Sequence, residues 1–256
     1  MFHFSKLWHR PRKPSANGRQ RLIWPDDEFA AIYAMSDIHG CCDAFVEAER
    51  RVYLDGGAVR GRKLIVLLGD YVDRGPDSQG VLQRLSAPVA DGFSRVTLAG
   101  NHDDEFARMY RSETMLSDWL DFAGIETLTS YGIGVEETLR SVGLRGLHNL
   151  ITERVDQRHV ELIDDLPVSL QIGRLFFVHA GLQPGVDLRR QTDTDMMWIR
   201  EPFLTEGPGL PIFVVHGHTP VLKPTFGRGR VAIDTAAAAT GNLSILKIAN
   251  GELTFI

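Results

Sequence analysis

The apolar run Leu64-Ile65-Val66-Leu67-Leu68 is followed directly by the polar block Gly69-Asp70-Tyr71-Val72-Asp73-Arg74-Gly75. A short run of aliphatic, partly β-branched residues that stops at glycine and aspartate is typical of a buried strand that ends in a loop. We therefore expect a strand over residues 63–68, with the carboxylates of Asp70 and Asp73 just beyond its carboxyl end.

Four other short polar blocks also follow apolar runs. They are Asp37-Ile38-His39-Gly40, Gly100-Asn101-His102-Asp103, His179-Ala180-Gly181 and Gly217-His218-Thr219. The carboxyl ends of parallel strands lie at one edge of a sheet, so side chains that are far apart in sequence are expected to converge there. The five blocks together predict one site built from carboxylate, imidazole and amide groups.

The order of strand, polar block and helix repeats three times in the first half of the chain. We expect strands over 31–36, 63–68 and 94–99, and helices over 42–53, 78–85 and 104–110. This repetition indicates an α/β sheet with partly parallel strands. A helical insert at about 104–168, with further helical pieces at 113–122, 135–142 and 156–163, is expected to wall the site. Residues 29–256 are expected to form a single domain.

The last third of the chain is rich in expected strands. They cover 168–172, 175–178, 212–215, 230–233, 243–248 and 252–256. We expect a second sheet packed on the first, since apolar sheet faces must be covered. Residues 184–211 lack a strong hydrophobic period and are expected to form a loop over the active face.

The formal net charge of −5 hides an asymmetry between the start of the chain and the rest. Residues 1–25 contain six Lys or Arg and no acid, so the rest is acidic. An acidic body argues against nucleic acid as a partner, because duplex binding needs a basic surface. Residues 1–28 are expected to be a flexible basic tail, with weak adhesion to an anionic membrane or partner as the alternative.

Two further features bear on the location of the protein. The basic start has no apolar run, so it predicts neither a secretory signal nor stable membrane insertion. The only cysteines, Cys41 and Cys42, are adjacent, which is unsuited to a disulfide. The cytoplasm is therefore the expected compartment. The cysteines are interpreted as small residues at a helix start, with oxidation sensitivity as the alternative.

The ligand types in the five blocks suit a pair of hard or borderline divalent cations. Asp70 directly follows its strand and is the expected bridge between the two ions. Two cations that share a carboxylate can polarise a phosphoryl group, so we expect a metal-dependent phosphoesterase. The remaining ligands divide into Asp37 and His39 for one metal, and Asn101, His179 and His218 for the other.

His102 directly follows Asn101, but its side chain should diverge from that of its neighbour. This is a suitable place for a general acid, and Asp73 is the expected carboxylate partner that fixes its tautomer. The guanidinium of Arg74 is expected to bind phosphate oxygens. Arg200 is either a second phosphate clamp or a surface arginine. His216 is expected to support the site without binding metal.

The five blocks resemble those of the calcineurin-like metallophosphoesterases, in particular the bacterial phosphoprotein phosphatases of the serine/threonine-specific type. The resemblance covers about residues 31–245. It extends to Trp119-Leu120, Thr127-Leu128, Ser130-Tyr131-Gly132, Trp198-Ile199-Arg200-Glu201 and Ile233-Asp234-Thr235. The match around Trp198 favours the interpretation of Arg200 as a phosphate clamp.

The resemblance implies a two-sheet β-sandwich flanked by helices in four layers, with two divalent metal ions, Mn²⁺ first and Fe or Zn²⁺ as alternatives. Asp37, His39 and Asp70 would hold one ion, and the second would be held by Asp70, Asn101, His179 and His218. A metal-bridging hydroxide would attack in line, and His102 with Asp73 would protonate the departing oxygen. The implied substrate is a phosphoprotein or phosphopeptide, and the implied enzyme a serine/threonine phosphatase.

Three positions depart from the family pattern: Ser36 and Ala236 stand where glycine is common, and Asp103 stands where glutamate is more common. Asp103 also occurs in related hydrolases of diadenosine tetraphosphate, which makes that activity the alternative. The Asp73-Arg74 pair favours phosphomonoesters. A catalytically silent module is a further hypothesis, which is opposed by the fact that every metal and acid position is filled. A nuclease is another, which is opposed by the acidic body of the chain.

Overall fold

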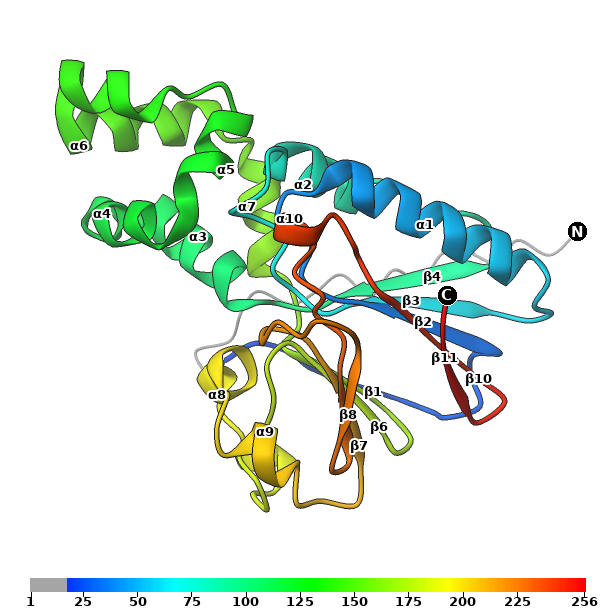
Figure 1. The fold of residues 1–256 in the computed structure, drawn as a ribbon. Coiled ribbons are helices and arrows are strands. Elements are labelled where there is room, and N and C mark those ends of the chain that lie inside the picture. The colour runs from blue at the N-terminus through cyan, green and yellow to red at the C-terminus, as the bar shows by residue number, and fades with distance from the viewer. Residues whose placement is uncertain (1–17) are drawn as a thin grey trace, which may run out of the picture.

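Three neighbouring parallel strands form one side of the first sheet in the computed structural model, which describes residues 18–256 (Figure 1). They are β2 (Ala31–Met35), β3 (Lys63–Leu67) and β4 (Phe93–Thr97). Two antiparallel strands, β10 (Ile245–Ala249) and β11 (Glu252–Phe255), complete the order β11-β10-β2-β3-β4. Every residue of β2 and β3 is buried, which explains why their sequences are apolar except for Lys63 at the start of β3.

A second, six-stranded sheet has the order β1-β5-β6-β7-β9-β8. It consists of β1 (Arg21–Trp24), β5 (Ser169–Ile172), β6 (Leu175–Val178), β7 (Phe213–His216), β8 (Thr225–Gly227) and β9 (Arg230–Ala232). Strands β6, β7 and β9 are parallel neighbours, so their carboxyl ends also lie at one edge.

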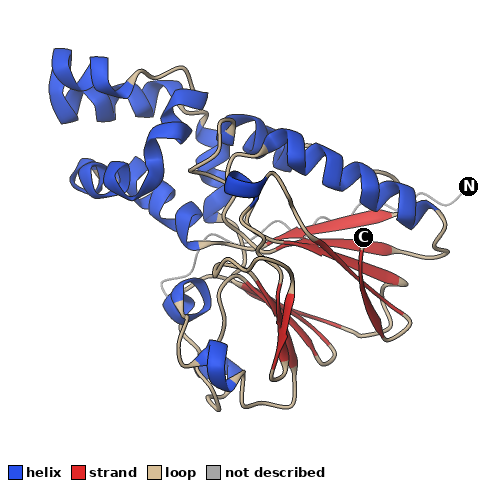
Figure 2. Cartoon of the chain, viewed as in Figure 1, coloured by secondary structure: helices blue, strands red, loops and turns tan. Residues whose placement is uncertain are grey.

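The two sheets pack against each other through alternate residues of their strands. Ile32, Leu64 and Val66 of the first sheet share one apolar cluster with Phe177 and Val215 of the second. Their neighbours along β2 and β3 point the other way, into a larger cluster beneath the helices. The expected two-sheet α/β sandwich flanked by helices is therefore confirmed (Figure 2).

Helices follow the three parallel strands, as the sequence predicts. They are α1 (Cys42–Gly57), α2 (Ser78–Ser86) and α3 (Asn101–Arg111). Helix α3 begins three residues earlier than expected, so Asn101 and His102 lie in its first turn. Within the described residues, 18–256, none of the helices is long and apolar enough to cross a membrane.

The segment between α3 and β5 is helical but more broken than the sequence suggests. The helix expected at 113–122 is a succession of short turns, η1 (Glu113–Met115), α4 (Leu116–Trp119) and the π-turn η2 (Leu120–Gly124), which lead into α5 (Ile125–Ser130). Helix α6 (Val135–Arg154) bends at Gly143, where φ is 66°, and continues twelve residues beyond the expected end. Helix α7 (Gln157–Asp164) then leads to β5.

Several elements were not expected from the sequence. The segment 184–211 contains η3 (Leu188–Arg190), α8 (Asp193–Trp198) and α9 (Phe203–Glu206) instead of an irregular loop. Strand β8 and the short α10 (Ala237–Thr240) were also missed. These elements have three to six residues, which is too short for a clear hydrophobic period.

The start of the described chain differs from the flexible tail expected over residues 1–28. Strand β1 pairs with β5, and Arg19 donates from Nη1 to the carbonyl oxygens of Ile163 (2.8 Å) and Leu166 (3.1 Å). Arg19 Nη2 also pairs with Asp104 at 2.8 Å. Residues 18–24 are therefore part of the folded domain, and the other part of the predicted tail, residues 1–17, lies outside the described residues.

Replacing Glu49 with alanine is expected to lower the free energy of unfolding by about 3–5 kcal/mol. Glu49 lies on α1, is 1% exposed, and pairs with Arg84 of α2 and with Arg95 of β4. Its loss leaves Arg95, whose side chain is only 9% exposed, without a counter-charge. Urea denaturation would measure the change. The matched control is Glu47→Ala, since Glu47 pairs with Arg50 on the same helix at an exposed position, and its loss should destabilise the fold much less. Equal losses in the two variants would contradict the prediction.

Candidate metal centre and active site

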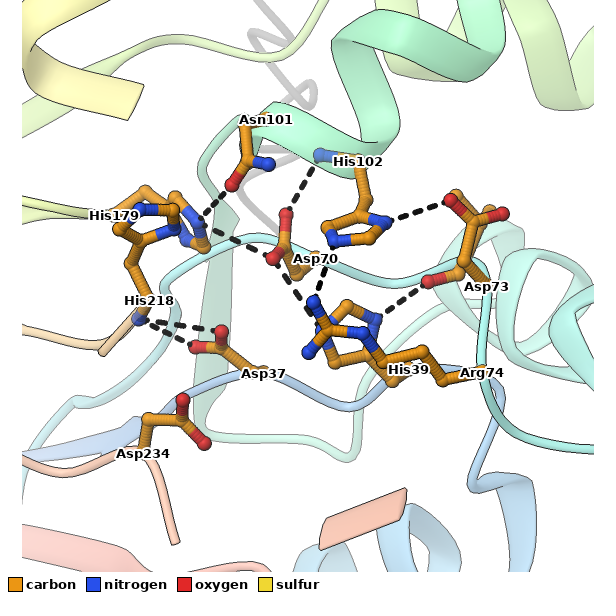
Figure 3. A network of polar contacts seen from close by, with 12 residues as sticks. Asp37, His39, Asp70, Asp73, Arg74, Asn101, His102, His179, His218 and Asp234 are labelled. Carbon is orange, nitrogen blue, oxygen red and sulfur yellow. Dashed lines mark hydrogen bonds and ion pairs between the residues drawn. The ribbon is translucent and has the colours of Figure 1, made fainter. Parts of the chain in front are cut away.

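The polar blocks converge where the carboxyl ends of the strands of the two sheets meet (Figure 3). Strand β2 leads to Asp37 and His39, β3 leads to Asp70, and β4 leads into α3. His179 follows β6, and His218 follows β7. All six predicted metal ligands are buried: Asp37, His39, Asp70, Asn101, His179 and His218.

Several site residues have left-handed backbone conformations, which are uncommon for residues with a side chain. The φ angles are 44° at His39, 56° at Asp70, 71° at Asp73, 66° at Arg74 and 64° at His218. Backbone hydrogen bonds connect the loop after β2 to the loop after β3. The amides of residues 38 and 39 both donate to the carbonyl oxygen of residue 70, at 3.0 and 2.9 Å. Such strain is retained where surrounding contacts fix the geometry, as at functional sites.

Asp103 fixes the loop that carries Asp70. Its carboxylate accepts the amides of Asp70 (2.8 Å), Tyr71 (2.8 Å) and Gly100 (2.9 Å). A side chain at position 100 would collide with Asp70, which explains the glycine there. Asp103 is thus a loop-fixing residue, a role that the sequence did not predict for it.

Asp70 is shared by two groups of potential ligands. Its Oδ2 lies 3.5 Å from Nε2 of His39 and 3.3 Å from Nε2 of His179. Within each group the ligand atoms lie within 4.8 Å of one another: one group is His39, Asp70 and His102, and the other is Asp70, His179 and His218. This is the position that a bridging carboxylate requires. The grouping of His102 with His39 differs from the sequence-based division, which placed Asp37 there.

The remaining two predicted ligands lie beside these groups. Asn101 Oδ1 is 2.9 Å from His179 Nε2. Asp37 accepts the backbone amide of His218 on both carboxylate oxygens, at 3.1 and 3.2 Å. The carboxylate of Asp37 thereby links the loop after β2 to the loop after β7.

A cation fits this donor set, because the free ring nitrogen of His39 faces another acceptor, the carboxylate of Asp70. His39 Nδ1 donates to the Val72 carbonyl oxygen at 2.7 Å, and His179 Nδ1 lies 3.0 Å from that of Leu68. Burial lowers the pKa of His39, so its Nε2 carries a lone pair that points toward Asp70. This buried Nε2 has no hydrogen-bond partner among the described residues. Histidines held through one ring nitrogen, with the other free, are typical metal ligands.

The crowding of carboxylates also fits a cation site. Burial, with the charge of Asp70, raises the pKa of Asp103 to about 7. Burial and the charge of Asp37 likewise raise the pKa of Asp234 to about 7 (Figure 3). Asp234 had no predicted role, although it lies in one of the segments that carry the family resemblance. Asp37, Asp70, Asp103 and Asp234 are all buried, and their carboxylates lie close together. Divalent cations would neutralise this concentration of negative charge.

His102 and Asp73 form a buried pair beside the metal groups. His102 Nδ1 lies 2.7 Å from Asp73 Oδ2, and Thr127 donates its hydroxyl to Asp73 Oδ1 at 2.8 Å. The backbone amide of Asp73 donates in turn to the Thr127 oxygen at 2.8 Å. Burial lowers the pKa of His102, but the charge of Asp70 and the hydrogen bond to Asp73 outweigh it, so this pKa is raised. Arg74 Nη2 lies 2.9 Å from His102 Nε2.

The rim of the site is formed by Arg200 and two aromatic side chains. Arg200 is exposed, and its positive charge adds to burial and to the charge of His179 in lowering the pKa of His218 to about 4. Phe122 stacks on His102, with ring centroids 4.3 Å apart, and Trp198 lies 6.3 Å from His218. Phe122 was not predicted as a site residue, because the π-turn that carries it has no signature in the sequence.

His216 is buried outside the metal groups. Its Nε2 lies 3.1 Å from Nη1 of Arg230, and its Nδ1 lies 3.1 Å from the carbonyl oxygen of Gly217. Burial and the charge of Arg230 lower its pKa to about 3, so the ring is neutral. These contacts agree with a supporting role behind the loop that carries His218.

Comparison with known proteins places this site in a family. The sequence profile of the calcineurin-like phosphoesterases matches residues 30–241. The asymmetrical bis(5′-nucleosyl)-tetraphosphatase PrpE of Geobacillus thermodenitrificans is 27% identical over 238 residues, which cover 84% of this chain and 89% of the relative.

Solved structures share the fold. The structure of a candidate diadenosine tetraphosphatase superposes with a TM-score of 0.62 at 20% identity, over 93% of this chain and 97% of the other. A protein serine/threonine phosphatase from Saccharomyces cerevisiae gives a TM-score of 0.54 at 15% identity, over 91% and 77% of the two chains. Since the family profile spans most of the sequence, this chain is a metallophosphoesterase that belongs to the calcineurin-like phosphoesterase family.

Proposed function

We propose that the protein hydrolyses dinucleoside tetraphosphates asymmetrically, to a nucleoside monophosphate and a nucleoside triphosphate. The observation that carries this proposal is the match to the asymmetrical tetraphosphatase PrpE along 84% of this chain. Serine/threonine phosphoprotein phosphatase activity, the first expectation from the sequence, becomes the second candidate. It rests on the resemblance of the motifs, with fold similarity to the yeast phosphatase.

The ligand set supports a dinuclear centre in which Asp70 bridges. Two cations would be held by Asp37, His39 and Asp70 on one side, and by Asp70, Asn101, His179 and His218 on the other. Mn²⁺ is the first candidate, and Fe or Zn²⁺ would suit the same ligands. When bound, such ions polarise phosphoryl oxygens and lower the pKa of water.

The chain's own side chains supply phosphate binding and proton transfer. The planar guanidinium of Arg74 can bind two phosphate oxygens, and in doing so it would leave the Nε2 atom of His102 that it now contacts. A proton on that nitrogen can then pass to the departing oxygen, while Asp73 stabilises the imidazolium. The exposed Arg200 would bind phosphates farther along the chain of the substrate.

Diadenosine tetraphosphate is expected to be hydrolysed by the Mn²⁺-loaded protein with a higher kcat/KM than a phosphothreonine peptide. Steady-state assays with separation of nucleotide products would measure both rates and would identify the expected AMP and ATP. A preference for the peptide would move the function to the second candidate. Two equal ADP products would exclude asymmetrical cleavage, and no activity with two metals bound would favour the silent module.

A further inference from the structure

Two large aromatic side chains are exposed beside the buried polar cluster. Phe122 is 40% exposed and Trp198 is 38% exposed, although both contact site residues that are almost completely buried. Phe122 lies in the π-turn η2, and Trp198 is the last residue of α8. They come from segments about 75 residues apart in sequence, so neither segment alone explains why their rings meet here.

The two rings form a continuous apolar surface from the acid to the second metal group. Phe122 stacks on His102 at 4.3 Å and 18°, and Trp198 lies 5.9 Å from Phe122 at 38°. Trp198 in turn contacts His218 edge-on. We call this surface, made by Phe122 and Trp198, the aromatic shelf. To hold a planar ligand between them, two rings must lie about 7 Å apart, which is twice the stacking distance. The rings of Phe122 and Trp198 are closer than this, so a ligand can stack only on the outer face of the shelf and not between the two rings.

We infer that the aromatic shelf binds a nucleobase of the dinucleoside polyphosphate by stacking, an inference that rests on the proposed function. Base stacking on an exposed aromatic ring is tolerant of base identity and strong enough to orient a substrate. The positively charged Arg200 is only two residues from Trp198, so one short segment presents both a ring for the base and a guanidinium for phosphate.

A stacked base would also determine which phosphorus is attacked. All phosphates of the substrate chain can bind cations and arginines, so these contacts alone do not distinguish an end from the middle of the chain. An anchored base fixes the distance from the nucleoside to the polar cluster. The shelf is therefore assigned as the specificity-determining element for asymmetrical cleavage.

The inference is tested with a matched pair of non-hydrolysable ligands, α,β-methylene-ADP and methylenediphosphonate, which differ by the adenosine group. Calorimetry on the Mn²⁺-loaded protein is expected to show that the adenosine group tightens binding by about 5- to 150-fold. This advantage should disappear in Trp198→Ala and be largely restored in Trp198→Phe. Trp198 is preferred to Phe122 for substitution because Phe122 stacks face to face on His102 at 4.3 Å, whereas Trp198 meets His218 edge-on at 6.3 Å. The control is Phe226→Ala, since Phe226 is an exposed aromatic residue on β8 that packs on Phe255.

The outcomes separate this inference from the proposed function. Suppose that the wild-type protein cleaves diadenosine tetraphosphate but binds α,β-methylene-ADP no more tightly than methylenediphosphonate. This result would overturn the shelf assignment and leave the proposed function intact. An adenosine advantage that survives in Trp198→Ala would also overturn it. Failure to cleave the dinucleotide, together with an adenosine advantage that depends on Trp198, would overturn the proposed function and support the shelf. A Trp198→Ala variant impaired only on a phosphotyrosine peptide would show that the shelf binds a phenol ring instead.

Discussion

The His102→Ala variant is expected to lose about 10²- to 10⁴-fold in kcat while it keeps its metal. His102 is 1% exposed, hydrogen-bonded to Asp73 through Nδ1, and directed with Nε2 toward the guanidinium of Arg74. The loss should be larger for substrates with poor leaving groups than for p-nitrophenyl phosphate, because only a poor leaving group needs a proton in the transition state. Steady-state kinetics and metal analysis of the same preparation would measure both properties.

The pH dependence offers a second test of the same role. A general acid works in its protonated form, so the rate should fall as pH rises above the raised pKa of His102. In Asp73→Asn the fall should begin at lower pH, since the carboxylate that helps to raise this pKa is gone. Thr127→Val should shift this fall less, because the Thr127 hydroxyl acts on His102 only through Asp73, to which it donates. Loss of metal in His102→Ala would instead indicate that His102 is a ligand, as its place in the group with His39 and Asp70 permits.

The strands that carry the site could be predicted because they are buried on both faces. Their sequences are apolar runs, apart from Lys63 at the start of β3, and each of β2 and β3 is followed by its polar block. β1 could not be predicted in this way, since it is half exposed and its partner β5 is nearly 150 residues away in sequence. The bend of α6 at Gly143 and the π-turn η2 likewise depend on packing that a local pattern does not contain.

The candidate site likewise contains residues that a local pattern predicts and residues that only tertiary contacts reveal. The residues that follow strand ends were predicted, and each of them contacts at least one other predicted site residue. Arg200 follows helix α8 instead of a strand. The residues that hold them were missed or had no assigned role. Thr127 reaches Asp73 from 54 positions away, and Asp103 binds amides of a different loop. Contacts of this kind arise from tertiary structure, so a single sequence cannot reveal them.

Asp70→Asn is expected to have the largest effect of any single substitution, because it removes the charge that both metal groups share. Its Oδ2 lies 3.5 Å from Nε2 of His39 and 3.3 Å from Nε2 of His179. The fold should survive, since asparagine tolerates the left-handed φ of 56° at this position and its Oδ1 can still accept the amide of His102. We expect the bound metal to fall below two ions per chain and kcat to fall by at least about 10³-fold, since metal ions contribute several kcal/mol.

Metal analysis and thermal unfolding of the same variant would distinguish loss of the centre from loss of the fold. Wild-type protein should be stabilised by added Mn²⁺, because a ligand that binds only the folded state raises its stability. In Asp70→Asn this stabilisation should be much smaller at the same Mn²⁺ concentration. Asp43→Asn, an equivalent change at an exposed position on α1, should behave as wild type. If Asp70→Asn still bound two ions per chain with undiminished stabilisation, Asp70 would not be the bridge, and the carboxylate shared by the two ions would have to be sought in Asp37, which ties the loop after β2 to His218.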